Sequence, residues 1–489
     1  MSDAREPEEP PPSAAKSSWV GAEWSRLLDR LKFLKRHIVA IAAVGAVLSG
    51  LVGYWTTYRT VHEVIAPAVV GNGRPDAKSP PAMSLVVIPL SAPQGDAETA
   101  RFADALTRDL VSRLGRENGG AGPLRVIAFQ GARAGEVTDS PELGRRLNAR
   151  YVLEGNVLRT GEGNAVNLQL LDTATGGQVW SERSTLQDTA LLGESAVKLR
   201  SLAQQLRTAI VVAEGRRVVA LPVAGLSAPE LVLRAGASLD QNTSSLAARN
   251  EARALTDKAL QLDPNSVPAL LGRVVLDEVV LDDFEVSVDP NADRGRLTRE
   301  MDEDSARAVG LDPNNARAWD RRAHALLYLG RWDQALGANA TAIKLDPDES
   351  EYLSNRANIM NHMGRPAEAL AFIDRALNTE ATPISNSTAA WTVCESYLLL
   401  GQADKAVSSC EKVAAGYRDN WLQAQLVAAY VDQGDMTKAA AAKTELLRMA
   451  PGFTVARARA ADQPQHPEYA KLAEKYFYEG LRKAEIPEQ

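Results

Sequence analysis

Apolar residues recur at helical spacing through the second half of the chain, in units of nearly constant length. Glycines at positions 330, 364, 401 and 434 each stand five residues before an alanine, and they are 34, 37 and 33 residues apart. The tripeptide Leu-Asp-Pro also returns, at 262–264, 311–313 and 345–347. This return of the same positions predicts a repeated structural unit built from helices.

A spacing of 34 residues is typical of the tetratricopeptide repeat (TPR), in which each unit is a pair of antiparallel helices. The glycine is expected to end the first helix of each pair, and the small alanine lets the second helix pack closely against it. One pair cannot bury its apolar face alone, so neighbouring pairs must stack. Residues 228–452 are therefore predicted to form an all-α TPR solenoid of about six pairs. The first two Leu-Asp-Pro copies are 49 residues apart, which is one period plus a 15-residue insertion.

A different pattern precedes the repeats. Short apolar runs, alternating runs and helical segments follow one another in the order strand, helix, strand, helix and then three strands. The last three strands are expected to be antiparallel, with Gly161-Glu162-Gly163 as a hairpin turn. Residues 83–188 are thus predicted to form a small α+β domain. The expected strands are 84–90, 124–129, 151–158, 165–171 and 178–184, and the expected helices are 96–116 and 141–149, the second of them capped by Ser140.

An uncharged and almost wholly apolar stretch runs from Ile38 to Tyr58. It is long enough to cross a bilayer as a single helix, and Tyr54 and Trp55 lie where interfacial aromatic residues belong. Lysines and arginines gather before this span, so the positive-inside rule places residues 1–37 in the cytoplasm. The bulk of the chain is then expected in the periplasm of a bacterium, anchored in the inner membrane. A cleaved signal peptide is the alternative, although 37 residues before the apolar run are long for one.

The surroundings of this span allow several interpretations. Basic and apolar residues alternate at helical spacing over 18–37, as in a helix on the membrane surface or in the solvated start of the span. Gly45, Ser49 and Gly53 lie four residues apart, which permits a homodimer through close helix packing but also occurs in ordinary spans. The Pro- and Glu-rich start is predicted to be disordered, and 59–82 is predicted to be a linker.

Composition and charge narrow the class of protein. Of 489 residues, 45% are hydrophobic and 5% aromatic, and the net charge is −7. An acidic balance without a basic block argues against a general nucleic-acid binder. The sequence contains no phosphate-binding loop, nucleophile elbow or zinc-protease motif, and its five histidines are scattered. The chain is therefore expected to be non-enzymatic, with no cofactor and no bound metal.

One segment imitates a calcium loop. Asp289, Asn291, Asp293 and Glu300 occupy positions 1, 3, 5 and 12 of an EF-hand pattern, but Arg294 stands where the pattern needs glycine. An arginine there opposes the charge of the ion. Polar loop residues and a helix cap are therefore the preferred interpretation.

The concave face of the predicted solenoid is the expected binding surface. The first helix of each pair lines this face, and a segment of a protein partner can lie in such a groove. Each side chain there can equally be ordinary surface or packing. The carboxylate-clamp pattern is not matched, because Ser354 stands where a lysine is needed. Alignment of the repeats on their alanines places six side chains near the groove: Arg317, His324, Asn358, His362, Trp391 and Trp421.

The two cysteines, Cys394 and Cys410, fall on the first and second helices of one predicted pair, at positions that face each other. Outside the cytoplasm they can form a disulfide. Alternatively, both are reduced and pack as small apolar residues.

The middle domain resembles a known family. Its segments FADALTRDLVSRL, ELGRRLNARYVLEGNVLR and VNLQLLDTATGGQVWSER are similar to the TolB amino-terminal-like domain across residues 84–188. That domain accompanies class III adenylate cyclases and CadC-like membrane regulators, often between a signalling domain and carboxy-terminal TPRs. Only 37 residues precede the predicted span, too few for a cyclase catalytic domain or a winged helix. The family's enzymatic and regulatory roles are therefore not carried over.

Together these patterns predict a membrane-anchored TPR scaffold that mediates protein–protein interactions. The alternative is a sensor or regulatory component of a cyclase- or CadC-like signalling system. The predicted boundaries are a cytoplasmic tail at 1–37, a transmembrane helix at 38–58, a linker at 59–82, the TolB-like domain at 83–188, a connecting helix and linker at 189–227, the TPR repeats at 228–452 and a capping helix at 453–489.

Overall fold

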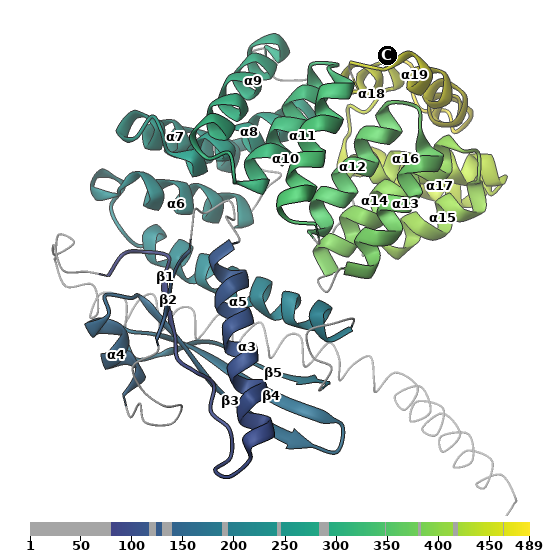
Figure 1. Cartoon of the computed structure of the whole chain (residues 1–489). Helices are drawn as coiled ribbons and strands as arrows, with labels where there is room; N and C mark the ends of the chain where they lie inside the picture. Colours follow the sequence, from purple (N-terminus) through teal and green to yellow (C-terminus); the bar gives the residue numbers. More distant parts are fainter. Residues whose placement is uncertain are drawn as a thin grey trace, which may run out of the picture. The chain divides into compact units, whose positions relative to one another are not determined.

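The computed structural model describes most of the chain from residue 80 onward (Figure 1). The described residues are 80–116, 124–129, 139–187, 194–241, 246–282, 293–347, 349–379, 383–413, 419–462 and 464–489. The predicted transmembrane helix at 38–58, with Gly45, Ser49 and Gly53, lies outside them. Within the described residues, no helix is both long enough and apolar enough to cross a bilayer.

The amino-terminal part of this structure is a five-stranded sheet in the order β2-β1-β3-β4-β5. Strand β1 runs parallel to both β2 and β3, whereas β3, β4 and β5 form an antiparallel meander. Gly163 opens β4 with a φ of 128°, which only glycine adopts readily, so the predicted hairpin turn is confirmed. The elements are β1 (Ser84–Val87), α3 (Ala97–Arg116), β2 (Arg125–Ala128), α4 (Ser140–Arg146), β3 (Tyr151–Thr160), β4 (Gly163–Asp172) and β5 (Gln178–Leu186).

The cap of α4 differs from the sequence prediction. Asp139, rather than Ser140, has extended backbone angles and accepts a hydrogen bond from the backbone N–H of Glu142 at 2.8 Å. Ser140 is instead the first helical residue, and its hydroxyl contacts Glu154 on β3. Both residues are good caps, and the contact between Ser140 and Glu154 is a tertiary one that sequence does not show.

A long helix, α5 (Glu194–Val219), connects the sheet to the helical part of the chain. Tyr151 on β3 donates a hydrogen bond to Glu214 at 2.8 Å, and Glu214 also pairs with Arg217 at 2.8 Å. One cluster of buried apolar residues continues from the sheet through α5 into α6 and α7. A short 3₁₀ turn, η2 (Val223–Gly225), follows α5.

Twelve helices then form six successive antiparallel hairpins within the described residues (Figure 1). The four glycines at 330, 364, 401 and 434 end first helices with φ between 66° and 83°, and the four matching alanines are buried. The hairpins are α6 (Ala228–Gln241) with α7 (Leu246–Leu262), α8 (Val267–Asp282) with α9 (Arg294–Leu311), α10 (Ala316–Tyr328) with α11 (Trp332–Leu345), α12 (Ser350–His362) with α13 (Pro366–Thr379), α14 (Pro383–Leu399) with α15 (Ala403–Lys412), and α16 (Asn420–Gln433) with α17 (Met436–Met449).

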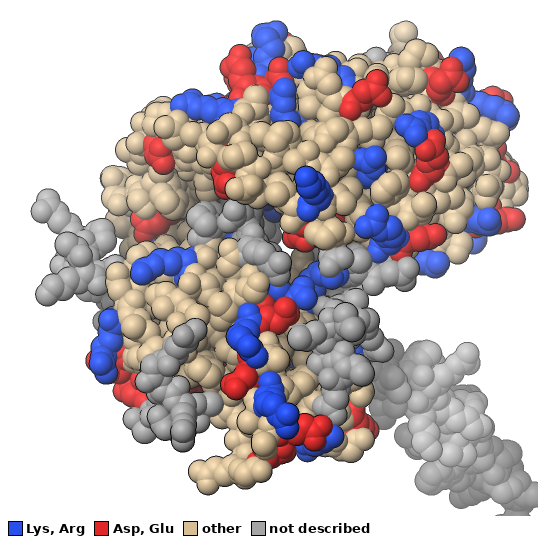
Figure 2. Space-filling model, viewed as in Figure 1, with Lys and Arg blue, Asp and Glu red and all other residues tan. Residues whose placement is uncertain are grey.

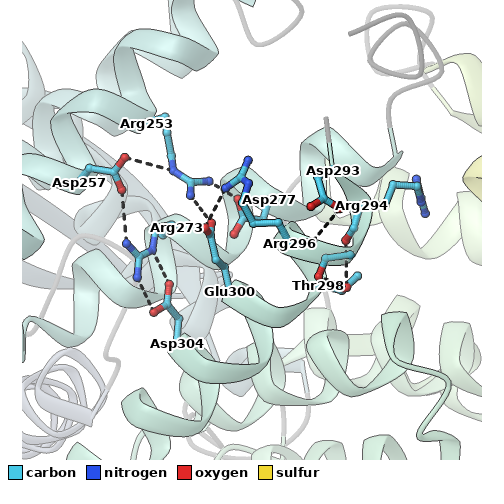
Figure 3. A network of polar contacts seen from close by, with 11 residues as sticks. Arg253, Asp257, Arg273, Asp277, Asp293, Arg294, Arg296, Thr298, Glu300 and Asp304 are labelled. Carbon is cyan, nitrogen blue, oxygen red and sulfur yellow. Dashed lines mark hydrogen bonds and ion pairs between the residues drawn. The ribbon is translucent and has the colours of Figure 1, made fainter. Parts of the chain in front are cut away.

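Charged side chains connect the first two hairpins. Figure 3 shows Arg273 of α8 between two carboxylates, with bonds of 2.5 and 2.6 Å to Asp304 of α9 and of 3.4 Å to Asp257 of α7. Arg253 of α7 pairs in the same way with Asp277 of α8 and with Glu300 of α9. Burial raises the pKa of Asp277 to about 7, although Arg253 opposes that shift. Each arginine thus links three helices.

The carboxy-terminal segment, residues 453–489, does more than cover the last hairpin. It consists of α18 (Val455–Ala461), α19 (Pro467–Ala473), the π-helical turn η5 (Glu474–Tyr478) and α20 (Glu479–Lys483). Its last two elements pack against α14 and α16, while its earlier residues reach the third and fourth hairpins. We call this segment the tail. The expectation of a single capping helix was wrong in this respect, because the tail lies across several repeats.

Candidate binding cavity

First helices of consecutive hairpins and the tail line a partly open cavity of about 100 Å³. Five of these helices contribute, in most cases through two residues that lie four positions apart and therefore on one face of the helix. Three tryptophans and two tyrosines belong to the lining. The lining residues are Glu278, His324, Leu327, Tyr328, Trp332, Asn358, His362, Trp391, Glu395, Trp421, Gln425, Ala461, Asp462, Pro464 and Tyr469.

The cavity brings together five of the six residues expected in the groove: His324, Asn358, His362, Trp391 and Trp421. The sixth, Arg317, is not in the lining. It lies on α10 one turn before Arg321, and its Nε atom has no hydrogen-bond partner among the described residues. Ser354, which stands where the carboxylate-clamp pattern needs a lysine, is buried. That these residues bind a protein stays a prediction.

Several lining residues did not emerge from the sequence. Glu395 and Gln425 follow Trp391 and Trp421 by four positions, so helical spacing could have identified them. Asp462 and Tyr469 come from the tail, and no repeat spacing relates them to the first helices. Only the tertiary structure places them in the cavity.

One side of the cavity is a compensated charge network. Glu278 accepts from His324 at 2.5 Å and from Arg321 at 3.0 Å. Burial alone would lower the pKa of His324, but the Glu278 carboxylate outweighs burial and raises this pKa to about 9. Burial would likewise raise the pKa of Glu278, and its two cationic partners lower it to about 2. The group is therefore charged and internally paired at neutral pH.

The His324→Gln variant is expected to lose stability in a pH-dependent way. The ordinary pKa of 6.5 rises to about 9 on folding, so the contribution of His324 is fully present below pH 6.5 and is lost as pH rises through 9. At about pH 6 we expect a loss of about 3 kcal/mol, from a pKa shift of this size. Urea unfolding of wild type and variant from about pH 6 to about pH 10 measures the difference between their free energies of unfolding. A difference that stays the same over this pH range would contradict the pairing of His324 with Glu278.

The opposite side holds two carboxylates and one imidazole. Asp462 accepts from the hydroxyls of Tyr469 at 2.9 Å and Tyr478 at 2.7 Å, and its other oxygen lies 3.8 Å from Nδ1 of His362. Glu395 accepts from the side-chain amide of Asn361 at 2.9 Å. Burial raises the pKa of Glu395 and of Asp462, and each carboxylate is flanked by the same His362. Burial thus favours the protonated form of both carboxyl groups, while the nearby His362 favours their charged form.

Three polar atoms at the cavity lack a partner in the described part of the chain. They are Oδ1 of Asn358, Nε1 of Trp391 and Oε1 of Gln425. Buried polar groups are nearly always hydrogen-bonded, to protein, water or ligand. These three buried atoms of lining residues therefore keep unused hydrogen-bonding capacity next to the cavity.

The apparent calcium loop has a different role. Asp293 caps α9 by accepting from the backbone N–H of Arg296 at 3.1 Å, and Glu300 pairs with Arg296 at 2.8 Å and with Arg253. Asp289 and Asn291 lie outside the described residues. No cluster of three candidate metal ligands occurs among the side chains that the structure describes. The helix-cap interpretation is confirmed for Asp293.

The sulfur atoms of Cys394 on α14 and Cys410 on α15 lie within bonding distance, and the Cα atoms are 5.2 Å apart. This Cα separation is within the range of protein disulfides. Both residues are fully buried, as the alternative of two reduced thiols would also require. The oxidation state in the cell stays a prediction.

Reduction is expected to destabilise the chain if the disulfide forms. For a sequence separation of 16 residues the entropic model gives a loss of about 3 kcal/mol. Urea unfolding with and without reductant measures this loss, and the Cys394→Ala/Cys410→Ala variant is the control that should not respond. Alkylation of both thiols in unreduced, denatured protein would contradict the disulfide.

Charges of both signs are interspersed on the face shown in Figure 2, and no broad surface of one sign is seen there. Among the described residues of this face there is no basic patch of the kind that binds nucleic acid (Figure 2). The cavity is therefore the feature of the described residues that most directly suggests a binding function.

The class of fold is a stack of TPR-like helical hairpins beside a small sheet. No model of a known protein family matches the chain. A protein of Rhizobium meliloti (strain 1021) named "Putative adenylate cyclase 3" is 28% identical over 265 residues. The match covers 53% of this chain and 43% of that protein, so the chain spans less than half the length of this relative.

Solved structures of TPR proteins are similar to part of the chain. The Pseudomonas aeruginosa pilF structure has 17% identity and a TM-score of 0.33, and it covers 47% of this chain and 95% of its own. A thermophilic TPR protein of Thermus thermophilus has 21% identity and a TM-score of 0.31, and it covers 40% and 95%. Likenesses this weak support no functional conclusion, and the hairpins themselves define the fold.

Proposed function

We propose that this chain is a non-enzymatic scaffold that binds a segment of a protein partner on the concave face of its helical hairpins. One observation carries the proposal. Successive first helices present residues four positions apart to one cavity, and three polar atoms there have no partner in the described part of the protein. A groove with side-chain pockets is the usual way in which helical repeats hold an extended segment.

Site-specific photo-crosslinking tests this function. A photoreactive amino acid at His362 lines the cavity, whereas the same group at Glu445 on α17 projects from an exposed position. We expect a crosslinked partner in native cells from the His362 position and not from the Glu445 position. Loss of this crosslink on Trp391→Ala would link the partner to the cavity. Equal crosslinking from both positions would contradict the scaffold function.

Membrane anchoring is a second part of the proposal. Residues 38–58 supply the span, residues 1–37 remain in the cytoplasm, and the hairpins lie in the periplasm. Alkaline phosphatase fused to the carboxy terminus should be active, and a cytoplasm-active fluorescent protein at the same place should be dark. The reverse result would place the hairpins in the cytoplasm. Gly45, Ser49 and Gly53 would let two such spans pair, which crosslinking within the membrane can detect.

The alternative function is a sensor or regulatory component of a cyclase- or CadC-like signalling system. The name of the 28% identical relative favours it, as does the resemblance of residues 84–188 to the TolB amino-terminal-like domain. Cyclic AMP measured in cells with and without the chain discriminates the two functions. Unchanged cyclic AMP favours the scaffold. Cyclic AMP made from ATP by the purified chain would overturn the non-enzymatic assignment.

A further inference from the structure

The tail covers part of the concave groove and contributes to the lining of the cavity. His466 of the tail meets Trp332 with ring centres 5.8 Å apart, Tyr469 meets His362 at 4.8 Å, and Phe477 meets Trp421 at 5.9 Å. These contacts fall on the third, fourth and sixth hairpins in order, so the tail runs along the array. Ligand selection in the cavity is therefore made jointly by the hairpins and by the tail.

Glu395 and Asp462 line the cavity without the close cationic partners that Glu278 has, and burial favours their protonated form. Glu278 is compensated by His324 and Arg321, but Glu395 and Asp462 face one shared imidazole, that of His362. A buried carboxylate without a full counter-charge is unfavourable. A cation placed between Glu395 and Asp462 would remove this cost, whereas an anion would increase it.

The unpaired polar atoms add a second, independent indication. Gln425 is only 3% exposed, lines the cavity and has no partner for Oε1. Oδ1 of Asn358, on another helix, is also unpaired. Both atoms are acceptors, so they call for N–H donors on the ligand. Nε1 of Trp391 is left for an acceptor on the same ligand or for water.

Aromatic rings complete the lining. Trp332, Trp391, Trp421, Tyr328 and Tyr469 surround the cavity. Aromatic faces attract organic cations, and the attraction is larger where the cation is removed from water. A volume of about 100 Å³ can hold the head group of a side chain or a small amine.

We infer that this cavity binds an organic cation that carries N–H donors, an alkylammonium or guanidinium group, between Glu395 and Asp462. The N–H groups are donated to Gln425 and Asn358, and the aromatic rings cover the carbon atoms next to the charge. The inference deepens the proposed function, and it rests on that function where the cation belongs to a bound protein segment. The cation comes either from a lysine or arginine of the bound protein segment or from a free small amine.

Binding to the purified full chain, followed by tryptophan fluorescence and calorimetry, tests the inference. One arm uses the free cations agmatine and n-butylamine, with n-butanol as the neutral control. The other arm uses the blocked tripeptides Gly-Lys-Gly and Gly-Arg-Gly, with Gly-Gln-Gly as the neutral control. We expect saturable binding of at least one cationic probe below about 10 mM and none of its neutral control.

Variants connect this binding to the cavity. Glu395→Gln removes one carboxylate at nearly constant shape, and Asn358→Ala removes one acceptor at a half-buried position. Each is expected to weaken cation binding about tenfold or more, since hydrogen bonds to charged groups are lost. Glu468→Gln changes an exposed tail carboxylate outside the lining and should bind as wild type. Circular dichroism confirms that each variant is folded.

The outcomes separate the inference from the proposed function. Binding of free cations but not of the cationic peptides supports the cavity as a site for small amines and weakens the case for a protein segment. Peptide binding that ignores charge overturns the inference and leaves the scaffold function intact. The inference is also overturned if none of the cationic probes binds saturably. The same holds if Glu395→Gln and Asn358→Ala both bind the cation with unchanged affinity.

Discussion

The Arg273→Ala variant is expected to lose about 2–3 kcal/mol of unfolding free energy, because a buried carboxylate loses its cation while the arginine itself is partly exposed. Arg273 makes two short bonds to Asp304, which is only 4% exposed. Without the guanidinium, this carboxylate remains buried and uncompensated. The loss would also loosen the second hairpin from α7, because Asp257 shares the same arginine.

Urea unfolding followed by circular dichroism measures this effect. Arg448→Ala is the matched control, since Arg448 pairs with Glu445 on the exposed face of α17 and exposed pairs contribute little. Arg273→Lys should fall between wild type and Arg273→Ala, because lysine retains the charge but cannot make the two-pronged contact. If Arg273→Ala unfolded at the same urea concentration as Arg448→Ala, the network of Figure 3 would not stabilise the fold.

The second large effect is expected from Gly364→Ala. Gly364 has a φ of 72°, and a Cβ atom there would lie 2.6 Å from Cβ of Glu468 and 2.8 Å from the backbone of the tail. Gly434 has a similar φ of 83°, but a Cβ atom there meets no atom within 4 Å. Both alanine variants incur about 1–2 kcal/mol for the left-handed backbone. Only Gly364→Ala must also displace the tail, which we expect to add about 1–3 kcal/mol.

The difference between the two variants therefore measures how firmly the tail is docked. Limited proteolysis should cut the tail of Gly364→Ala faster than that of Gly434→Ala, and hydrogen exchange should lose protection over α19. Equal behaviour of the two variants would mean that the tail is not held against the fourth hairpin. Because the tail supplies Asp462 and Tyr469, its displacement would also open the cavity.

Sequence reasoning succeeded where the information was local or periodic. The positions of the strands followed from short apolar runs and from alternation, and the helix pairs followed from glycines and alanines that return at a nearly fixed interval. The groove residues His324, Asn358, His362, Trp391 and Trp421 could be placed on one surface because equivalent positions of stacked units must face the same way. Arg317 is the one residue of the six that does not line the cavity.

The sequence by itself determined the order of elements, the period of the hairpins and the side of α10, α12, α14 and α16 that lines the cavity, because these depend on patterns within about one repeat. The tertiary structure decided which carboxylates are compensated and which are not, and how the tail returns across the array. Asp462 lies 100 residues after His362 in the chain but beside it in the fold. No spacing rule connects such positions, since their approach depends on how all the intervening hairpins stack.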